Sequence, residues 1–244
     1  MKIFLINIGN THIQYTICKN GIIDNFKQIP TEDFTLDIIP KNIQIAAASV
    51  VPKIKEQLQE SSFSNKIFWL THDKILNIDL SRVNAKDLGA DRLANAIILA
   101  EHTNKNTIAV SIDFGTCITF EIVDNNQIFR GGAIVPGRKL LRKALHNYTA
   151  QLPLIPLHDT TAPDLGESTE SAMRLGIDNG VIGTVKELIN DLETRFHGCA
   201  IQIFATGGDQ KFFTERIEKL IEGNTFFTLR GILKAWEMNN NNEG

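Results

Sequence analysis

Residues 6–11 read Ile-Asn-Ile-Gly-Asn-Thr, and residues 112–116 read Ile-Asp-Phe-Gly-Thr. In both places an apolar run typical of a buried strand leads into a turn that contains glycine. Each turn is followed by a run with period-two alternation, which is typical of a half-buried strand. A third short apolar run comes next, at residues 21–26 and 127–132. Each copy therefore predicts a three-stranded antiparallel unit.

A second repeated pair occurs in the same order along the chain. Residues 43–49 read Ile-Gln-Ile-Ala-Ala-Ala-Ser, and residues 201–207 read Ile-Gln-Ile-Phe-Ala-Thr-Gly. Each precedes a charged run with helical spacing, and internal repetition of this kind indicates duplicated units. The chain is therefore expected to be an α/β protein with two similar halves, residues 1–105 and 106–244. The polar tail from Met238 to Gly244 has nothing to bury and is expected to be frayed.

The composition excludes several classes of protein. The net charge is −3, whereas a general nucleic-acid binder is usually basic. No apolar run approaches the roughly 20 residues that span a bilayer, and Asn7 and Gly9 interrupt the short apolar N-terminus, which argues against a signal peptide. The three cysteines are too few and too dispersed for a disulfide framework or a zinc cluster. These features predict a cytoplasmic protein with no nucleic-acid or membrane partner.

The two glycine turns have the form of phosphate-binding loops. A tight turn between strands can aim backbone N–H groups into one concavity, which suits an anion, and Gly9 and Gly115 allow close approach. The side-chain donors beside these glycines are Asn10, Thr11 and Thr116. A carboxylate just before the turn, Asp113 in the second copy, can hold Mg²⁺ directly or through water. Two such turns facing each other predict a nucleotide site, and the alternative is that each is only a hairpin.

Two further glycine segments are candidates for close contact with a ligand. Thr206-Gly207-Gly208-Asp209 lies between an expected strand and an expected helix, where adenosine is the natural ligand if the turns hold phosphates. The alternative is a loop in which Asp209 caps the helix. Gly131 and Gly132 open a Gly-Gly-Ala run that suits close approach of a substrate, or a structural turn. The helix expected after this run is predicted to bury Leu140, Leu141, Ala144 and Leu145.

Asp91 lies near the start of a helix expected to run to about His102. A carboxylate in a first turn is favoured by the helix dipole, which is sufficient reason for its presence. The functional interpretation is a general base that accepts the proton of a substrate hydroxyl. The sequence alone leaves both interpretations open.

Eight motifs taken together are similar to those of a known family. They are I-G-N-T at 8–11, A-S-V-V-P at 48–52, L-G-A-D-R-L-A-N-A at 88–96, D-F-G-T-C-I-T at 113–119, G-G-A-I-V-P-G at 131–137, L-H-N-Y-T-A-Q-L-P at 145–153, S-T-E-S-A at 168–172 and A-T-G-G-D at 205–209. The chain resembles type III pantothenate kinases, of the acetate-kinase/sugar-kinase/heat-shock-70/actin superfamily. Each motif is weak alone, but together and in order they are specific and cover nearly the whole chain.

The resemblance implies a fold of two actin-like/ribonuclease-H-like halves, each a mixed sheet with flanking helices, with a ligand cleft between them. It implies ATP-dependent phosphorylation of pantothenate to 4'-phosphopantothenate, the first step of coenzyme A synthesis. It further implies Mg²⁺, a monovalent cation such as K⁺ or NH₄⁺, and a homodimer whose active site lies near the interface.

The resemblance also assigns roles to residues by position. Asp91 corresponds to the general base, and Asp113 to the residue beside the metal. The residues implied to bind pantothenate are Gly89, Ala90, Asp91, Arg92, Gly131, Gly132 and, from the other subunit, Thr169. The residues implied to bind ATP are Asn7, Gly9, Asn10, Thr11, Gly115, Thr116, Gly207 and Gly208.

The sequence departs from the family pattern at three places. Asn7 replaces the aspartate of the first turn, Glu121 replaces an aspartate in the strand after Gly115, and residues 81–85 lack the usual Tyr and Pro. Asn7 keeps an acceptor oxygen but has no charge for a metal. Two hypotheses follow: a working pantothenate kinase, or a kinase-inactive paralogue acting as a ligand-binding or regulatory protein. A sugar or acetate kinase of the same fold is a third.

Overall fold

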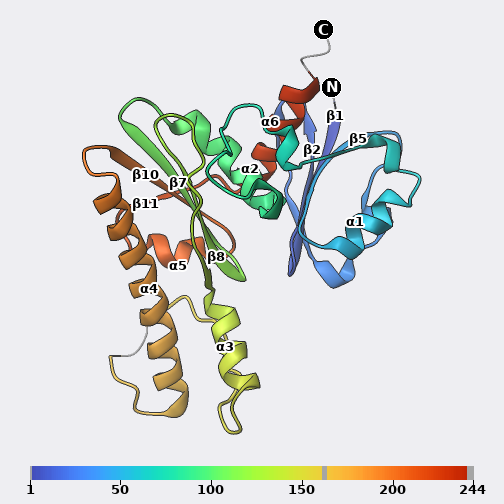
Figure 1. Ribbon diagram of the computed structural model, residues 1–244. Coiled ribbons are helices and arrows are strands. Elements are labelled where there is room, and N and C mark those ends of the chain that lie inside the picture. The colour runs from blue at the N-terminus through green and yellow to red at the C-terminus, as the bar shows by residue number, and fades with distance from the viewer. Residues whose placement is uncertain (1, 161–163, 241–244) are drawn as a thin grey trace.

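The computed structural model describes residues 2–160 and 164–240, which form two lobes, each built on a mixed β-sheet (Figure 1). The strands of the first lobe are β1 (Lys2–Ile8), β2 (His12–Lys19), β3 (Ile22–Ile23), β4 (Lys27–Pro30), β5 (Gln44–Ser49) and β6 (Ile67–Trp69). The strands of the second lobe are β7 (Thr107–Phe114), β8 (Cys117–Val123), β9 (Ile134–Pro136), β10 (Ala200–Thr206) and β11 (Leu220–Glu222).

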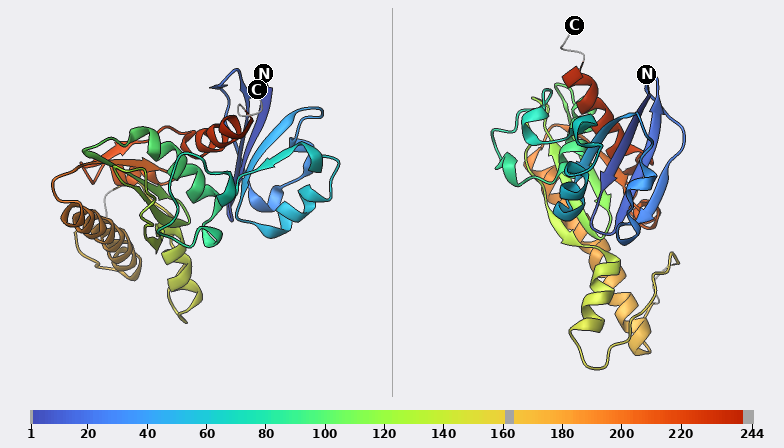
Figure 2. Two further views of the ribbon diagram at one scale, coloured as in Figure 1. Left: turned by 45° about the horizontal axis from the view of Figure 1, so that its top comes forward. Right: turned by 90° about the vertical axis from the view of Figure 1, so that its right-hand side faces the viewer.

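The helices join these strands and cover the sheets. The α-helices are α1 (Pro52–Gln59), α2 (Ala90–Leu99), α3 (Arg138–Asn147), α4 (Thr169–Arg195), α5 (Gln210–Thr214) and α6 (Phe227–Asn240). Short 3₁₀ turns lie at Thr31–Asp33, Leu36–Ile38, Ser64–Lys66, His72–Lys74, Ala85–Asp87 and Ala100–His102. Helix α3 and the first half of α4 extend away from the second sheet as an arm, which Figure 1 and the right-hand view in Figure 2 show.

The two sheets share one topology, which confirms the duplicated α/β architecture. The strand order is β3-β2-β1-β5-β6 in the first lobe and β9-β8-β7-β10-β11 in the second, with β4 as an additional partner of β2. In each lobe the first strand pairs antiparallel with the second and parallel with the strand that follows the connecting segment. The longer connection of the second lobe contains α3 and α4.

The third strand of the second copy differs from the sequence expectation. It was predicted at residues 127–132, whereas β9 comprises Ile134–Pro136. The preceding segment follows β8 irregularly, because Gly131 has a φ of +86°, outside the β region. An isolated bridge joins Phe129 to Val123 there. Ile122 of β8 accepts from the Arg130 N–H at 2.8 Å and donates to Gly131 O at 3.1 Å, but these bonds do not form a regular strand. The corresponding strand of the first copy is also short, since β3 ends at Ile23.

Helices α2 and α6 lie between the two sheets (Figure 1) and bring the end of the chain onto the first lobe. On α6, Leu229, Ile232 and Trp236 join a buried core with Ile3 and Leu5 of β1. Gly231 permits a close helix crossing, because a Cβ atom there would lie 1.9 Å from the carbonyl oxygen of Ala94. The C-terminal helix therefore completes the core of the first lobe.

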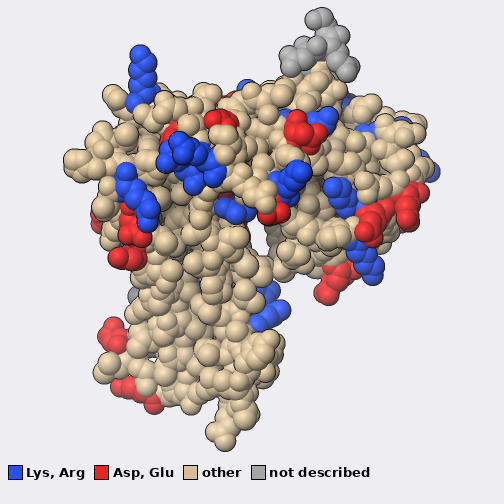
Figure 3. Space-filling model, viewed as in Figure 1, with Lys and Arg blue, Asp and Glu red and all other residues tan. Residues whose placement is uncertain are grey.

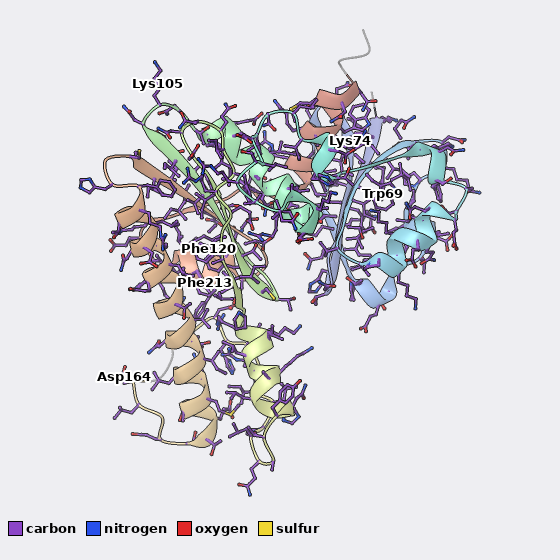
Figure 4. The ribbon with its side chains drawn as sticks, viewed as in Figure 1. Trp69, Lys74, Lys105, Phe120, Asp164 and Phe213 are labelled. Atoms are coloured by element: carbon purple, nitrogen blue, oxygen red, sulfur yellow. The ribbon has the colours of Figure 1, made fainter. Side chains whose placement is uncertain are left out.

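The tail and α3 correct two further expectations. Helix α6 continues through Asn240, and the Asn239 amide donates to the Lys74 carbonyl oxygen at 2.9 Å. The frayed tail was therefore wrong for residues 238–240, and residues 241–244 lie outside the described ones. On α3 the fully buried side chains are Arg138 and Arg142, while the leucines expected there are half-buried. Figure 4 labels Phe120 of β8 and Phe213 of α5, both in the core of the second lobe.

Candidate active site

The two glycine turns face each other across the space between the lobes. The hydroxyl oxygens of Thr11 and Thr116 lie 2.7 Å apart and share a hydrogen bond. Each turn is closed by its glycine, because Gly9 N–H donates to His12 O and Gly115 N–H donates to Cys117 O, both at 3.1 Å. The surface is hollowed between the lobes (Figure 3). The sequence prediction that the two turns meet is consistent with this geometry.

The Thr206–Asp209 loop packs against the second turn. The Asp209 N–H donates to the Phe114 carbonyl oxygen at 3.0 Å. Gly207 has a φ of +91°, and a Cβ atom there would lie 2.3 Å from Asp113 Oδ1 and 2.7 Å from Phe114 N. Gly208 faces open space instead. The loop thus brings Gly207 directly beside the carboxylate expected to lie near a metal.

Gly207→Ala is expected to lower the unfolding free energy by about 2–5 kcal/mol. A left-handed conformation costs a non-glycine residue about 1–2 kcal/mol, and the clash with Phe114 and Asp113 adds about 1–3 kcal/mol. Gly208→Ala is the matched control, since its Cβ meets no atom within 4 Å. Urea denaturation of both variants measures the difference, and equal losses would contradict the role assigned to Gly207.

Asp91 and Arg92 lie in the first turn of α2, against β8. Asp91 Oδ1 accepts from the Arg92 N–H at 2.8 Å, and a Cβ on Gly89 would lie 2.6 Å from that oxygen. The Arg92 guanidinium donates to Glu121 Oε1 at 2.9 Å and to Phe120 O at 3.0 Å. The buried residue Ala90 lies behind this turn. The start of α2 therefore brings together the predicted substrate residues Gly89, Ala90, Asp91 and Arg92.

The Gly131–Gly132 segment closes one side of this cluster. A Cβ on Gly132 would lie 1.6 Å from Phe120 O and 3.1 Å from the Arg92 guanidinium. Only glycine fits between this strand and Arg92 without displacement. A Cβ on Gly131 would touch Val83 at 3.7 Å, so the loop that departs from the family pattern lies against this segment.

Three carboxylates from different elements influence one another in this region. Burial, with the negative charges of Glu121 and Asp91, raises the pKa of Asp113 to about 7. Burial also raises the pKa of Asp91 and of Glu121, and in both the Arg92 charge opposes the rise. Glu121 is fully buried and accepts from Ser111 Oγ at 2.8 Å as well as from Arg92. Mutual repulsion of buried carboxylates favours a cation beside them.

Asp113 suits a Mg²⁺ site of the kind found with nucleotides. Such ions are typically held by one or two carboxylates, with phosphate oxygens and water completing the shell. Within residues 2–160 and 164–240, no three side chains of metal-binding type are grouped closely enough to hold an ion. The single carboxylate of Asp113 fits an ion whose other ligands are phosphate oxygens and water.

The contribution of Asp113 to the unfolding free energy of the ligand-free protein is expected to fall as pH rises from about 4 to 7. In this window folded Asp113 keeps a proton that the unfolded chain releases, so each pH unit costs up to about 1.4 kcal/mol. Above pH 7 both states are ionised and the contribution is constant. Asp113→Asn removes this titration. The Tm of Asp113→Asn minus the Tm of the parent chain should therefore increase from pH 5 to pH 7 and then stay constant. Thermal denaturation without Mg²⁺ measures it, and a difference independent of pH would contradict the assignment.

Two predicted site residues lie outside this cluster. Asn7 is the penultimate residue of β1 in the first lobe, opposite Ala48 and Gln14, at the position that matches Asp113 in the second. Thr169 is the first residue of α4 and is exposed on the arm, away from α2 (Figure 1). Its role was predicted only through a second subunit, and that prediction stays open.

The sequence analysis missed a buried ion network at the base of the arm. Arg138 and Arg142 both bond to Asp178, which is fully buried on α4. The amphipathic pattern of residues 138–147 favoured the leucines as the inward face. The only signal for burial is the four-residue spacing of the arginines, which is common on exposed helices as well.

The architecture places the chain in the class of two-lobed α/β proteins with the actin-like ATPase fold. A protein of the Baf family of transcriptional activators from Campylobacter jejuni shares the fold with a TM-score of 0.67 at 21% identity, over 98% of this chain and 99% of that one. The activator of 2-hydroxyisocaproyl-CoA dehydratase from Clostridium difficile, solved with bound ADPNP, does so with a TM-score of 0.54 at 13% identity, over 99% and 98%.

Within this class the chain belongs to the type III pantothenate kinase family, whose model matches residues 3–191. It is 29% identical to the type III pantothenate kinase of Flavobacterium johnsoniae, over 99% of this chain and 100% of that protein. It is 31% identical to that of Methylacidiphilum infernorum, over 93% and 85%. No helix in the described part of the chain is long and apolar enough to cross a membrane.

Proposed function

We propose that this protein transfers the γ-phosphoryl group of ATP to pantothenate, giving 4'-phosphopantothenate in coenzyme A synthesis. The observation that carries the proposal is the position of the Asp91 and Asp113 carboxylates beside two glycine turns whose tips touch through Thr11 and Thr116. Family membership supports pantothenate as the substrate, and the two facing turns beside these carboxylates support binding of the nucleotide's phosphates next to a general base.

The residues then have the following roles. The first turn (Asn7, Gly9, Asn10, Thr11), the second turn (Gly115, Thr116) and the loop glycines Gly207 and Gly208 bind ATP. Asp113 would hold Mg²⁺, which would offset phosphate charge when bound, and a monovalent cation, K⁺ or NH₄⁺, would complete the site. Asp91 takes the proton of the pantothenate hydroxyl, the freed oxygen bonds to the γ-phosphorus, and ADP leaves. A raised pKa brings Asp91 closer to the working pH, where a base is most effective.

The pantothenate side of the site is formed by Gly89, Ala90, Arg92, Gly131 and Gly132. Glu121 and the Phe120 carbonyl fix the Arg92 guanidinium, and its remaining N–H donors are free to bind the substrate carboxylate. The backbone of Gly132 lies so close to the Arg92 guanidinium that a Cβ atom there would be 3.1 Å from it. Orientation of the substrate by a held arginine is the kind of positioning that accelerates a reaction between two bound molecules.

We further propose a homodimer formed through the arm, with Thr169 reaching the partner's substrate. The arm and its neighbouring loops expose large apolar side chains, with Tyr148 88% and Leu165 71% exposed. The face in Figure 3 shows few charged side chains on this arm. Apolar patches of this kind often mark association surfaces.

The free thiols of Cys18, Cys117 and Cys199 support a reducing cytoplasm as the place of action.

The proposed function is tested by incubating the purified protein with ATP, pantothenate, Mg²⁺ and either K⁺, NH₄⁺ or Na⁺. Mass spectrometry of the product is expected to show 4'-phosphopantothenate, with an equal amount of ADP. Absence of product under every cation, from a protein that still binds ATP, would favour the kinase-inactive alternative that Asn7 raises. Parallel reactions with glucose and acetate separate the other kinase activities of this fold.

A further inference from the structure

We propose that Arg138 is a positioning residue for the nucleotide, because its guanidinium holds the Thr206–Asp209 loop against the second glycine turn. The inference rests on the proposed function in so far as that loop and turn bind ATP. It concerns the buried network at the base of the arm, which the reaction chemistry does not use.

The backbone around Arg138 is fixed on the second turn. Arg138 begins α3 directly after Gly137, whose N–H donates to the Thr116 carbonyl oxygen at 2.9 Å. A Cβ on Gly137 would lie 2.4 Å from Gly115 O and 2.7 Å from Thr116 O. The start of α3 is thus in direct contact with the turn, and movement of one displaces the other.

The guanidinium of Arg138 connects three other segments. It donates to Asp178 Oδ1 of α4 at 2.9 Å, to Asp209 Oδ1 at 2.8 Å and to His158 O at 2.5 Å. Its central carbon lies 3.3 Å from the centre of the Phe212 ring on α5. Arg138 is 1% exposed, so its guanidinium is shielded from water, and its bond to the fully buried Asp178 is strong. The Asp209 side chain is 20% exposed, so the bond to Asp209 is partly shielded.

Asp209 transmits this restraint to the nucleotide loop. Its side chain is held by Arg138, and its N–H donates to Phe114 O of the second turn at 3.0 Å. Gly207, two residues earlier, lies against Asp113. Arg138 and the backbone of Phe114 therefore hold the loop from two sides, with the glycines left free to accept a ligand.

Stability alone does not account for this arrangement. Arg142 donates to the same Asp178 oxygen at 2.8 Å and is equally buried, so Asp178 has a partner without Arg138. Burying a second cation costs several kcal/mol in lost hydration, and apolar replacements of buried ion pairs are often neutral or stabilising. Arg138 also contacts His158 O and the Phe212 ring, but the charged partner that distinguishes it from Arg142 is Asp209.

Arg142 therefore provides a matched control for Arg138. The other hydrogen bonds of Arg142 go to Pro156 O at 3.3 Å and Arg138 O at 3.2 Å, both on the arm. Arg138→Met and Arg142→Met each remove one buried positive charge from Asp178. Both are expected to lower Tm, but only Arg138→Met releases the nucleotide loop.

The experiment is calorimetric titration of each variant with ATP and Mg²⁺, beside KM for ATP and for pantothenate. Arg138→Met is expected to raise both the Kd and the KM for ATP by roughly 10-fold and to leave the KM for pantothenate unchanged. Arg142→Met should change ATP binding less than about 3-fold. Equal weakening in the two variants, or a lower Tm in Arg138→Met with unchanged ATP binding, would overturn the proposal.

Asp209→Asn provides the second arm of the test. It keeps the Arg138–Asp178 pair and decides the question if Arg138→Met does not fold. It should weaken ATP binding by a similar factor, and in its background Arg138→Met should add little, because both changes remove one coupled interaction. Fully additive effects would show that Arg138 does not act through Asp209. If the parent chain binds ATP but does not phosphorylate pantothenate, the proposed function fails while the binding data still test Arg138.

Discussion

Asp91→Asn is expected to lower kcat for pantothenate phosphorylation by about 10²–10⁴-fold, the usual contribution of a general base. Asparagine retains the oxygen that accepts the Arg92 N–H bond, so the start of α2 should remain folded. The amide is not basic and cannot take the hydroxyl proton. KM for ATP should change little, because Asp91 lies among the proposed pantothenate residues.

The measurement is steady-state kinetics with Asp87→Asn as the control. Asp87 is an exposed carboxylate four residues earlier, and its contact is with Asn84. Its variant should retain the parent kcat. Turnover sustained in Asp91→Asn would remove Asp91 as the base and favour its simpler interpretation as a carboxylate placed by the helix dipole.

Asn7→Asp is expected to raise Mg²⁺ affinity and kcat/KM by about 10–100-fold, the usual effect of a group that acts on a metal directly or through water. Asn7 occupies in the first lobe the position that Asp113 occupies in the second. A carboxylate there would give the bound ion a charged partner on both sides of the phosphates. Because added negative charge raises the pKa of Asp113 further, the gain should be larger at pH 8 than at pH 6.

Asn10→Asp separates this effect from a general gain in negative charge. Asn10 is exposed at the tip of the same turn, so its carboxylate would repel the ATP phosphates and lower activity. Mg²⁺ titration of kcat/KM in the parent chain and both variants gives the comparison. Unchanged or lower activity in Asn7→Asp counts against a metal role for this position.

Much of the fold could be predicted because each copy of the repeat has a local sequence pattern of apolar strands and glycine turns. The glycine turns at Gly9 and Gly115 and their alternating strands predicted two like sheets, and the observed strand orders match. Prediction of β9 was wrong because the left-handed conformation of Gly131 interrupts pairing where the apolar pattern continues. The helix that contains Asp91 was predicted to end near His102. The structure has an α-helix over Ala90–Leu99, followed by a 3₁₀ turn over Ala100–His102.

The site could be predicted only where its residues belong to motifs. Gly207 and Asp113 were both proposed, but their contact depends on the parallel pairing of β7 with β10, far apart in sequence. The Arg92–Glu121 pair likewise joins α2 to β8. The burial of Arg138 was not predicted, because hydrophobic periodicity identifies only apolar residues as buried. Arg138 is charged, and it is buried because Asp178 and Asp209 neutralise its charge.

The position of α6 has a consequence for how this chain is made. Residues 2–8 are synthesised well before residues 227–240, which cover one face of the strand that residues 2–8 form. The first lobe therefore exposes an apolar face until residues 227–240 have been synthesised. A nonsense mutation shortly before Phe227 spares every residue assigned to catalysis, but it removes the layer that closes the first core. Such a product would be a target for chaperones and proteases rather than a slightly shortened enzyme.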